Sequence, residues 1–202
     1  LAQNLAMIAR ESGATSNMIL LAAFALFLCR ISGQDDIVIG SPLAGRTRKE
    51  LEPLIGFFVN TLPIRCRLDG NPTFQELLGR VRKAVADTIE HQHLPFERLV
   101  EKLQPVRNPS HTPIFQVVFG YQESPPATID LPDLVVTHLE MEGTTAKHDL
   151  TLLMEATGEN FSGILEYNTD LFSAGTAHRY VGCFQQILRS VVASPQLRLN
   201  DI

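Results

Sequence analysis

The fold of this chain is decided by residues 55–68, Ile-Gly-Phe-Phe-Val-Asn-Thr-Leu-Pro-Ile-Arg-Cys-Arg-Leu. The first half of this stretch is apolar at both alternating positions, which is typical of a strand covered on both faces. The second half alternates apolar residues with Arg65 and Arg67, which is the period-two pattern of a half-exposed strand. The sequence therefore predicts one long strand that runs from the core towards solvent.

Three residues qualify this prediction. Asn60 and Thr61 interrupt the apolar half, and a buried carboxamide costs a few kcal/mol unless its donors and acceptors are paired. Either neighbouring backbone or a ligand must satisfy them. Pro63 has no N–H to donate, so the strand must lie at a sheet edge or separate from its neighbour there.

Composition bounds the class of protein. The chain has 202 residues, 45% of them hydrophobic, which is enough for one large domain or two small ones. The formal net charge is −5, the sequence pI is about 5.7, and no block of Lys or Arg occurs. This balance argues against nucleic acid or an anionic membrane as the main partner and favours a protein or a neutral small molecule.

Cysteine usage and the apolar segments indicate a compartment. Cys29, Cys66 and Cys183 are widely spaced among apolar neighbours, so we expect buried thiols in a reducing cytoplasm, not disulfides or a metal site. The longest apolar run, residues 18–29, is too short to cross a bilayer and predicts a core helix. The helical spacing of apolar residues already begins at Leu1 with no capping residue before it, so we expect this chain to be part of a longer polypeptide.

Helices and strands are intermingled around the central stretch. We therefore expect an α/β or α+β domain built on a mixed sheet. A cap at Thr15 or Ser16, a capping box of Thr73 and Glu76 and a cap at Ser173 mark three helix starts. With their caps, the predicted helices occupy 1–11, 15–29, 73–91, 95–103 (with Phe96, Leu99 and Leu103 inward) and 173–192, and the other predicted strands occupy 37–40, 114–121, 134–141, 149–157 and 161–168.

Histidine is the first side chain to consider for proton transfer, because it titrates near neutrality. His91 and His93 lie two apart at a helix end, a spacing that favours end-capping or solvent exposure over metal ligation. His148 and Asp149 are neighbours on a predicted strand and so point to opposite faces, which argues against a catalytic dyad. The sequence thus predicts neither a catalytic group nor a metal site.

Charged residues in loops are weaker candidates. Arg46 and Arg107 are either anion contacts or ordinary surface guanidinium groups. Glu97 follows Pro95 and either stabilises a helix N-terminus through the helix dipole or contacts a substrate.

Five ordered stretches together resemble the C-terminal half of the condensation domains of nonribosomal peptide synthetases. They are GSPLAGR at 40–46, IGFFVNT at 55–61, HQHLPFE at 91–97, RNP at 107–109 ahead of FQ at 115–116, and YNTDLF at 167–172. The sequence departs from the family pattern at His93, where Asp is usual, and at His148, where an aromatic residue commonly precedes the Asp-Leu pair.

The resemblance implies that residues 1–202 form the C-terminal lobe of a two-lobed fold like that of chloramphenicol acetyltransferase. The family joins two carrier-tethered aminoacyl thioesters through a peptide bond, and its His-His-x-x-x-Asp-Gly motif belongs to the other lobe. We therefore expect no catalytic residue here and no activity from this chain alone. The excursion around 122–141 would be the crossover that latches onto the missing lobe.

The resemblance also implies roles for individual residues and partners. The phosphopantetheine arms would be carried by peptidyl carrier domains, with no cofactor held by the chain itself. The other partner would be the N-terminal lobe. The residues expected to line the tunnel are Asn60, Thr61, Gly45 and Arg46. Arg46 and Arg107 are more suited to orienting loops through hydrogen bonds. The residues expected to have structural roles are Gly56, Phe58, Pro95, Phe96, Glu97, Arg107, Asn108, Asp149 and Asn168.

A different class of function is also open. The lobe would expose the apolar surface that meets its partner, and it would then act as a carrier-binding or self-associating module without chemistry. Epimerisation domains, heterocyclisation domains and freestanding acyltransferases share the fold, although the residues at 57–61 and 91–97 favour a condensation domain.

Overall fold

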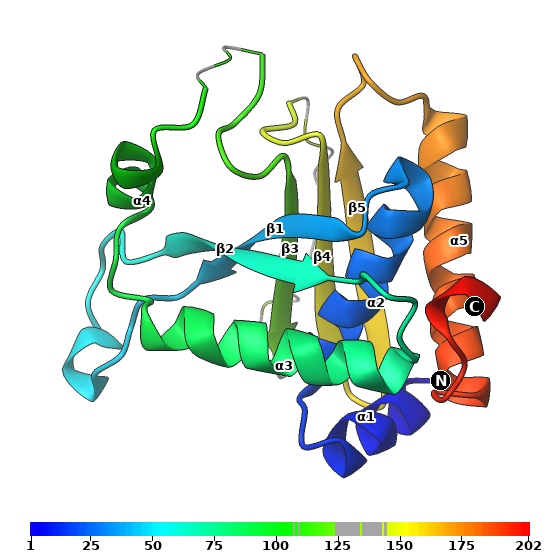
Figure 1. The fold of residues 1–202 in the computed structure, drawn as a ribbon. Helices are drawn as coiled ribbons and strands as arrows, with labels where there is room; N and C mark the ends of the chain where they lie inside the picture. Colours follow the sequence, from blue (N-terminus) through cyan, green and yellow to red (C-terminus); the bar gives the residue numbers. More distant parts are fainter. Residues whose placement is uncertain (107, 109, 124–133, 135–142, 144) are drawn as a thin grey trace.

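The computed structural model describes residues 1–202 except 107, 109, 124–133, 135–142 and 144. Five strands form one sheet in the order β2-β1-β3-β4-β5 (Figure 1). Outer pairs β1–β2 and β4–β5 are antiparallel, whereas β1–β3 and β3–β4 are parallel, so the predicted mixed sheet is confirmed. The strands are β1 (Asp36–Leu43), β2 (Asn60–Arg67), β3 (Val117–Glu123), β4 (Leu150–Thr157) and β5 (Asn160–Tyr167).

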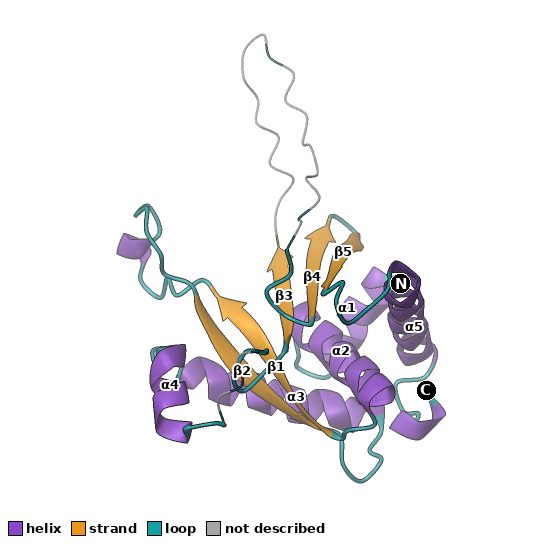
Figure 2. Cartoon of the chain, turned by 90° about the horizontal axis from the view of Figure 1, so that it is seen from above, coloured by secondary structure: helices purple, strands orange, loops and turns teal. Residues whose placement is uncertain are grey.

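Three helices cover the same face of this sheet, and a fourth stands apart beside β2 (Figure 2). The covering helices are α2 (Ser16–Ser32), α3 (Phe74–Glu90) and α5 (Ala174–Ala193); the others are α1 (Ala2–Glu11), α4 (Phe96–Leu103) and the 3-10 turns η1 (Lys49–Leu51) and η2 (Leu199–Asp201). Helix α2 lies at the centre of the core, where the Phe24 ring meets Phe119 of β3 at 5.9 Å and Phe184 of α5 at 6.3 Å.

Within the described residues, no single helix is long and apolar enough to cross a membrane. The pair α1 and α2 passes by length and composition only when taken together, and it is bent by 102°.

Helix starts follow the predicted caps. The Thr15 hydroxyl accepts a bond from the N–H of Met18, Thr73 and Glu76 bond reciprocally, and Ser173 accepts from the N–H of Thr176. These bonds satisfy backbone donors that have no partner inside the helix. Helix α2 extends three residues beyond the predicted end at Cys29, because left-handed Gly33 is the residue that terminates it.

The prediction of one long strand over 55–68 is wrong in its first half. Strand β2 begins at Asn60, which pairs with Leu43, the last residue of β1, so the residues before Asn60 have no strand to pair with. Ile55 and Phe57 are consequently not in the core but fully exposed, at 105% and 93% of their reference areas. The apolar pattern predicted a strand buried in the sheet, but in the structure these residues form an exposed apolar loop.

The second half of the stretch behaves as predicted. Ile64, Cys66 and Leu68 are buried while Arg65 and Arg67 are exposed, and burial raises the pKa of the Cys66 thiol to about 12. Strand β2 is an edge strand, as Pro63 requires.

Several smaller predictions need correction. Cys183 is exposed on α5, not buried, and Cys29 is half-buried. Leu103 is 59% exposed, because α4 lies beside the sheet instead of on it. Strand β3 starts at Val117, three residues late, since Ile114 adopts a positive φ of 72° that extended chain excludes. The predicted strand at 134–141 and most of the excursion at 122–141 fall outside the described residues.

Candidate functional site

A hollow of about 420 Å³ lies between β2, the loop before it and the start of α4. Three of the sequence stretches quoted above meet there, although they are far apart in the chain. The hollow is lined by Gly45, Thr47, Phe57, Phe58, Val59, Asn60, Thr61, Gln92, His93, Pro95, Phe96 and Glu97. Most of the predicted tunnel residues and the predicted Phe58, Pro95, Phe96 and Glu97 are therefore brought to one place.

One wall is fixed by a close backbone contact at Gly45. This glycine has a φ of +67°, and a Cβ built on it would lie 1.9 Å from the carbonyl oxygen of Phe58. Only glycine combines this left-handed conformation with so close an approach. Gly45 therefore holds the exposed 55–59 segment against the end of β1.

Arg46 reinforces the same wall. Its guanidinium lies 4.4 Å from the centroid of the Phe58 ring, in cation–π geometry. Its Nη1 donates to the carbonyl oxygens of Leu51 and, at 3.3 Å, Glu52. Arg46 thereby connects the end of β1 to the chain at residues 51 and 52.

Asn60 ties β2 to the loop after α3. Its Nδ2 donates to the carbonyl oxygens of Gln92 at 3.0 Å and Leu94 at 2.9 Å. The fold thus provides acceptors for both amide hydrogens, while Oδ1 has no hydrogen-bond partner within the described part of the chain and can accept from a ligand. Asn60 sets the position of the chain just before Pro95 starts α4.

The opposite wall rests on an aromatic stack. The Phe96 ring lies 5.2 Å from that of Phe115, which is buried and covers Gly40 of β1. A Cβ on Gly40 would come within 2.3 Å of the Phe115 ring, so this stacking also needs a glycine. Because α4 has no fully buried residue of its own, Phe96 and Phe115 are its main anchor to the sheet.

His148 also contacts Phe115, with ring centroids 5.9 Å apart. Its Nδ1 is buried and has no hydrogen-bond partner among the described residues. Burial lowers the pKa of the imidazole, and the opposing attraction from Glu166 and Asp149 does not reverse this shift. His148 therefore resembles a core aromatic residue more than a base.

Replacing His148 by Phe is expected to preserve the stack and to remove the unpaired nitrogen, whose burial costs about 1–3 kcal/mol. In the wild type the folded-state pKa of His148 is lowered, so the unfolded state binds more protons as the pH falls below about 6.5. The stability advantage of His148→Phe should therefore grow between pH 7.5 and pH 5.5. Urea unfolding at both pH values measures this, and a difference independent of pH would contradict it.

Other predicted residues do not line the hollow. The N–H of Asp149 donates to the carbonyl of Gln116 at 2.9 Å, and the carbonyl of Asp149 accepts from the N–H of Asn168 at 3.0 Å. Asn168 and Asn108 each use Oδ1 to accept a backbone N–H two residues on, which shapes a turn. Gly56 packs beside the Phe58 ring, and Arg107 lies outside the described residues.

The hollow contains polar groups but no assembled acid–base pair. His93 and Glu97 both line it, yet no histidine–carboxylate ion pair occurs in the described part of the chain. The same residues contain no group of three or more side chains able to hold a metal ion.

Sequence reasoning missed the contributions of Phe57, Phe115 and Thr47. Phe57 and Phe115 lie inside the quoted stretches 55–61 and 115–116, so these motifs could have identified both residues. Thr47 lies in a polar loop and carried no signal that would single it out.

The chain thus combines a mixed five-stranded sheet, covered by helices on one face, with an open hollow beside edge strand β2. The family model described as "Condensation domain" matches residues 1–202, and the chain belongs to this family. It is 43% identical, over 204 residues covering 100% of the chain, to one of the linear gramicidin synthase subunits of Brevibacillus parabrevis. It is also 43% identical, over 94% of the chain, to malpinin synthetase of Mortierella alpina.

Solved structures agree with the fold. A four-domain nonribosomal peptide synthetase bound to AMP and glycine matches with a TM-score of 0.90, 27% identity and 100% of this chain covered. The X-domain from teicoplanin biosynthesis matches with a TM-score of 0.85 and 28% identity. The chain spans 3% of the gramicidin synthase polypeptide, 2% of malpinin synthetase, 16% of the four-domain structure and 47% of the X-domain chain.

Proposed function

We propose that this chain is the C-terminal lobe of a peptide-bond-forming condensation domain and supplies one wall of a two-lobed reaction chamber. The observation that carries the proposal is the hollow built from the stretches at 40–46, 55–61 and 91–97, which is open and holds no paired acid and base among the described residues. The chain also matches 47% of the length of an X-domain structure, which leaves about half of such a domain to come from elsewhere.

An exposed apolar segment supports a partner lobe beside the hollow. Ile55 and Phe57 are fully exposed, and Leu94 is 45% exposed. Full burial of a Phe or Ile side chain is worth about 1.5–3 kcal/mol, so leaving both in water is unfavourable. The N-terminal lobe would cover these side chains and close the chamber.

The chemistry then divides between the two lobes. The acceptor amine nitrogen attacks the donor thioester carbonyl carbon; the C–N bond forms, the C–S bond breaks, and the proton lost by the amine accompanies the leaving thiolate. The other lobe would supply the histidine for this proton. This lobe would hold the two phosphopantetheine-borne groups at reacting distance, an effect worth up to about 7–11 kcal/mol.

Mixing the two lobes tests the proposal. This chain alone is expected to form no dipeptide from two aminoacyl carrier proteins, and adding the N-terminal lobe should restore formation. Light scattering should show the heterodimer at the same time. Dipeptide formation by this chain alone would contradict the proposal.

A second candidate, a docking module without chemistry, has one observation in its favour. The chain is 30% identical, with a TM-score of 0.86, to an X-domain solved in complex with OxyB. In that case carrier or enzyme partners would bind this lobe, and the reconstituted two-lobe domain would bind them but form no dipeptide.

A further inference from the structure

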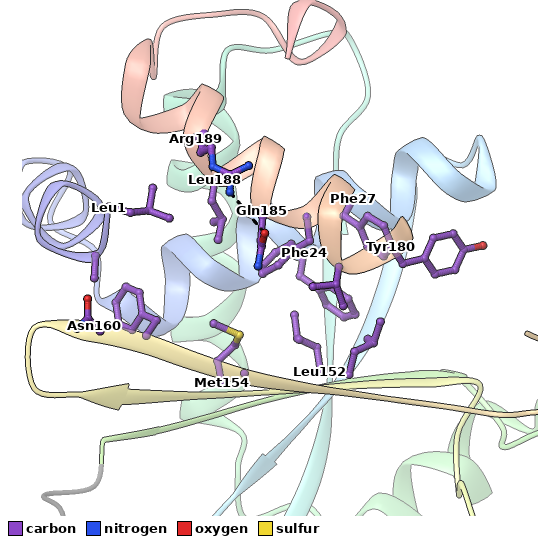
Figure 3. A pocket seen from close by; sticks show the side chains of 16 residues that line it. Leu1, Phe24, Phe27, Leu152, Met154, Asn160, Tyr180, Gln185, Leu188 and Arg189 are labelled. Atoms are coloured by element: carbon purple, nitrogen blue, oxygen red, sulfur yellow. Dashed lines mark hydrogen bonds between the residues drawn. The ribbon is translucent and has the colours of Figure 1, made fainter. Parts of the chain in front are cut away.

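A second pocket lies between α5 and the β4–β5 hairpin (Figure 3), at the opposite edge of the sheet from β2 and the hollow. Its volume is about 280 Å³, near the lower end of small-molecule sites. It shares no lining residue with the hollow beside α4, so it is a separate feature.

The interior of this pocket is apolar. Figure 3 shows Leu152 and Met154 extending from the sheet towards the helices, and Phe24 and Phe27 of α2 also line the pocket. The unbranched thioether side chain of Met154 adapts readily to an irregular ligand surface. Such walls accept an alkyl chain or a single ring and reject a charged group.

The rim carries a cation and an amide on successive turns of α5. Gln185 points into the pocket, and the Arg189 guanidinium lies 3.5 Å from its Oε1 (Figure 3). The ion pairs found in the described part of the chain do not include Arg189. An apolar interior beneath an arginine that lacks a carboxylate partner is complementary to a small amphipathic anion.

We propose that this pocket binds a small carboxylate with an apolar body, its chain lying against Phe24 and Met154 and its carboxylate on Arg189. Decanoate is the probe, since its alkyl chain suits the pocket volume and its carboxylate can accept two bonds from a guanidinium. The proposal does not depend on the condensation function.

The test uses the intact two-lobe condensation domain, titrated with decanoate and with 1-decanol by calorimetry and by thermal unfolding. Decanoate should bind and raise the Tm, and decanol should bind at least tenfold more weakly. Arg189→Gln should weaken decanoate binding at least tenfold, whereas Arg179→Gln, an exposed arginine of the same helix outside the pocket, should not. Val181→Phe, at the rim, should block entry without unfolding the domain.

Two results would overturn the proposal. Absence of decanoate binding by the intact domain would mean that polypeptide fills or closes the pocket. Equal affinity for decanoate and decanol, unchanged by Arg189→Gln, would mean unspecific apolar partitioning.

Discussion

Replacing Gly45 by Ala in the intact domain is expected to lower the free energy of unfolding by about 3 kcal/mol or more. Left-handed backbone costs a non-glycine residue about 1–2 kcal/mol, and forcing apart an over-close contact adds about 1–3 kcal/mol. The new methyl group would lie 1.9 Å from the Phe58 carbonyl oxygen, so the 55–59 segment must move away. Urea unfolding measures the loss, and faster chymotryptic cleavage after Phe57, which the N-terminal lobe would otherwise cover, would report the movement.

Gly33→Ala is the matched control. Gly33 has nearly the same φ, +70°, but a Cβ there meets nothing within 4 Å, so this variant should show only the backbone cost of about 1–2 kcal/mol. If the two variants lost equal stability and Phe57 were cleaved no faster in Gly45→Ala, the contact between Gly45 and Phe58 would have no energetic role.

Replacing Asn60 by Asp is expected to have the second large effect. A carboxylate cannot donate, so it would face the carbonyl oxygens of Gln92 and Leu94 at about 3 Å without a hydrogen between them. The loop that leads into α4 should open, and the hollow should lose a wall. Dipeptide formation by the intact domain should fall at least tenfold with Asp and less with Ala, which only removes two bonds worth about 0.5–1.5 kcal/mol each.

Asn108→Asp is the control for this substitution. Among the described residues, Asn108 bonds through Oδ1, as an acceptor from Ser110, and a carboxylate accepts equally well. The stability of the Asn108→Asp domain and its rate of dipeptide formation should therefore stay near those of the wild type. Unchanged turnover in Asn60→Ala, with the domain still folded, would remove Asn60 from the site.

Local signals gave most of the secondary structure. The capping residues at Thr15, Thr73 and Ser173 act over three residues, so the helix starts could be read directly. Alternation likewise predicted strands at 149–157 and 161–168, which the structure confirms as the antiparallel pair β4 and β5. The mistake at Ile55 and Phe57 arose because an apolar pattern reports a tendency to be buried but not the surface that does the burying.

Most of the helices and strands and the mixed sheet could be predicted from the sequence alone, since these depend on short-range backbone and side-chain chemistry. The stretches at 40–46, 55–61 and 91–97 were recognised only by their resemblance to a family. What only the tertiary structure decided is how those motifs meet. The approach of Gly45 to Phe58, the bonds from Asn60 to the loop beyond α3, and the stack of Phe96 on Phe115 join residues 13 to 34 positions apart. Such contacts depend on how whole elements pack, which no local pattern specifies.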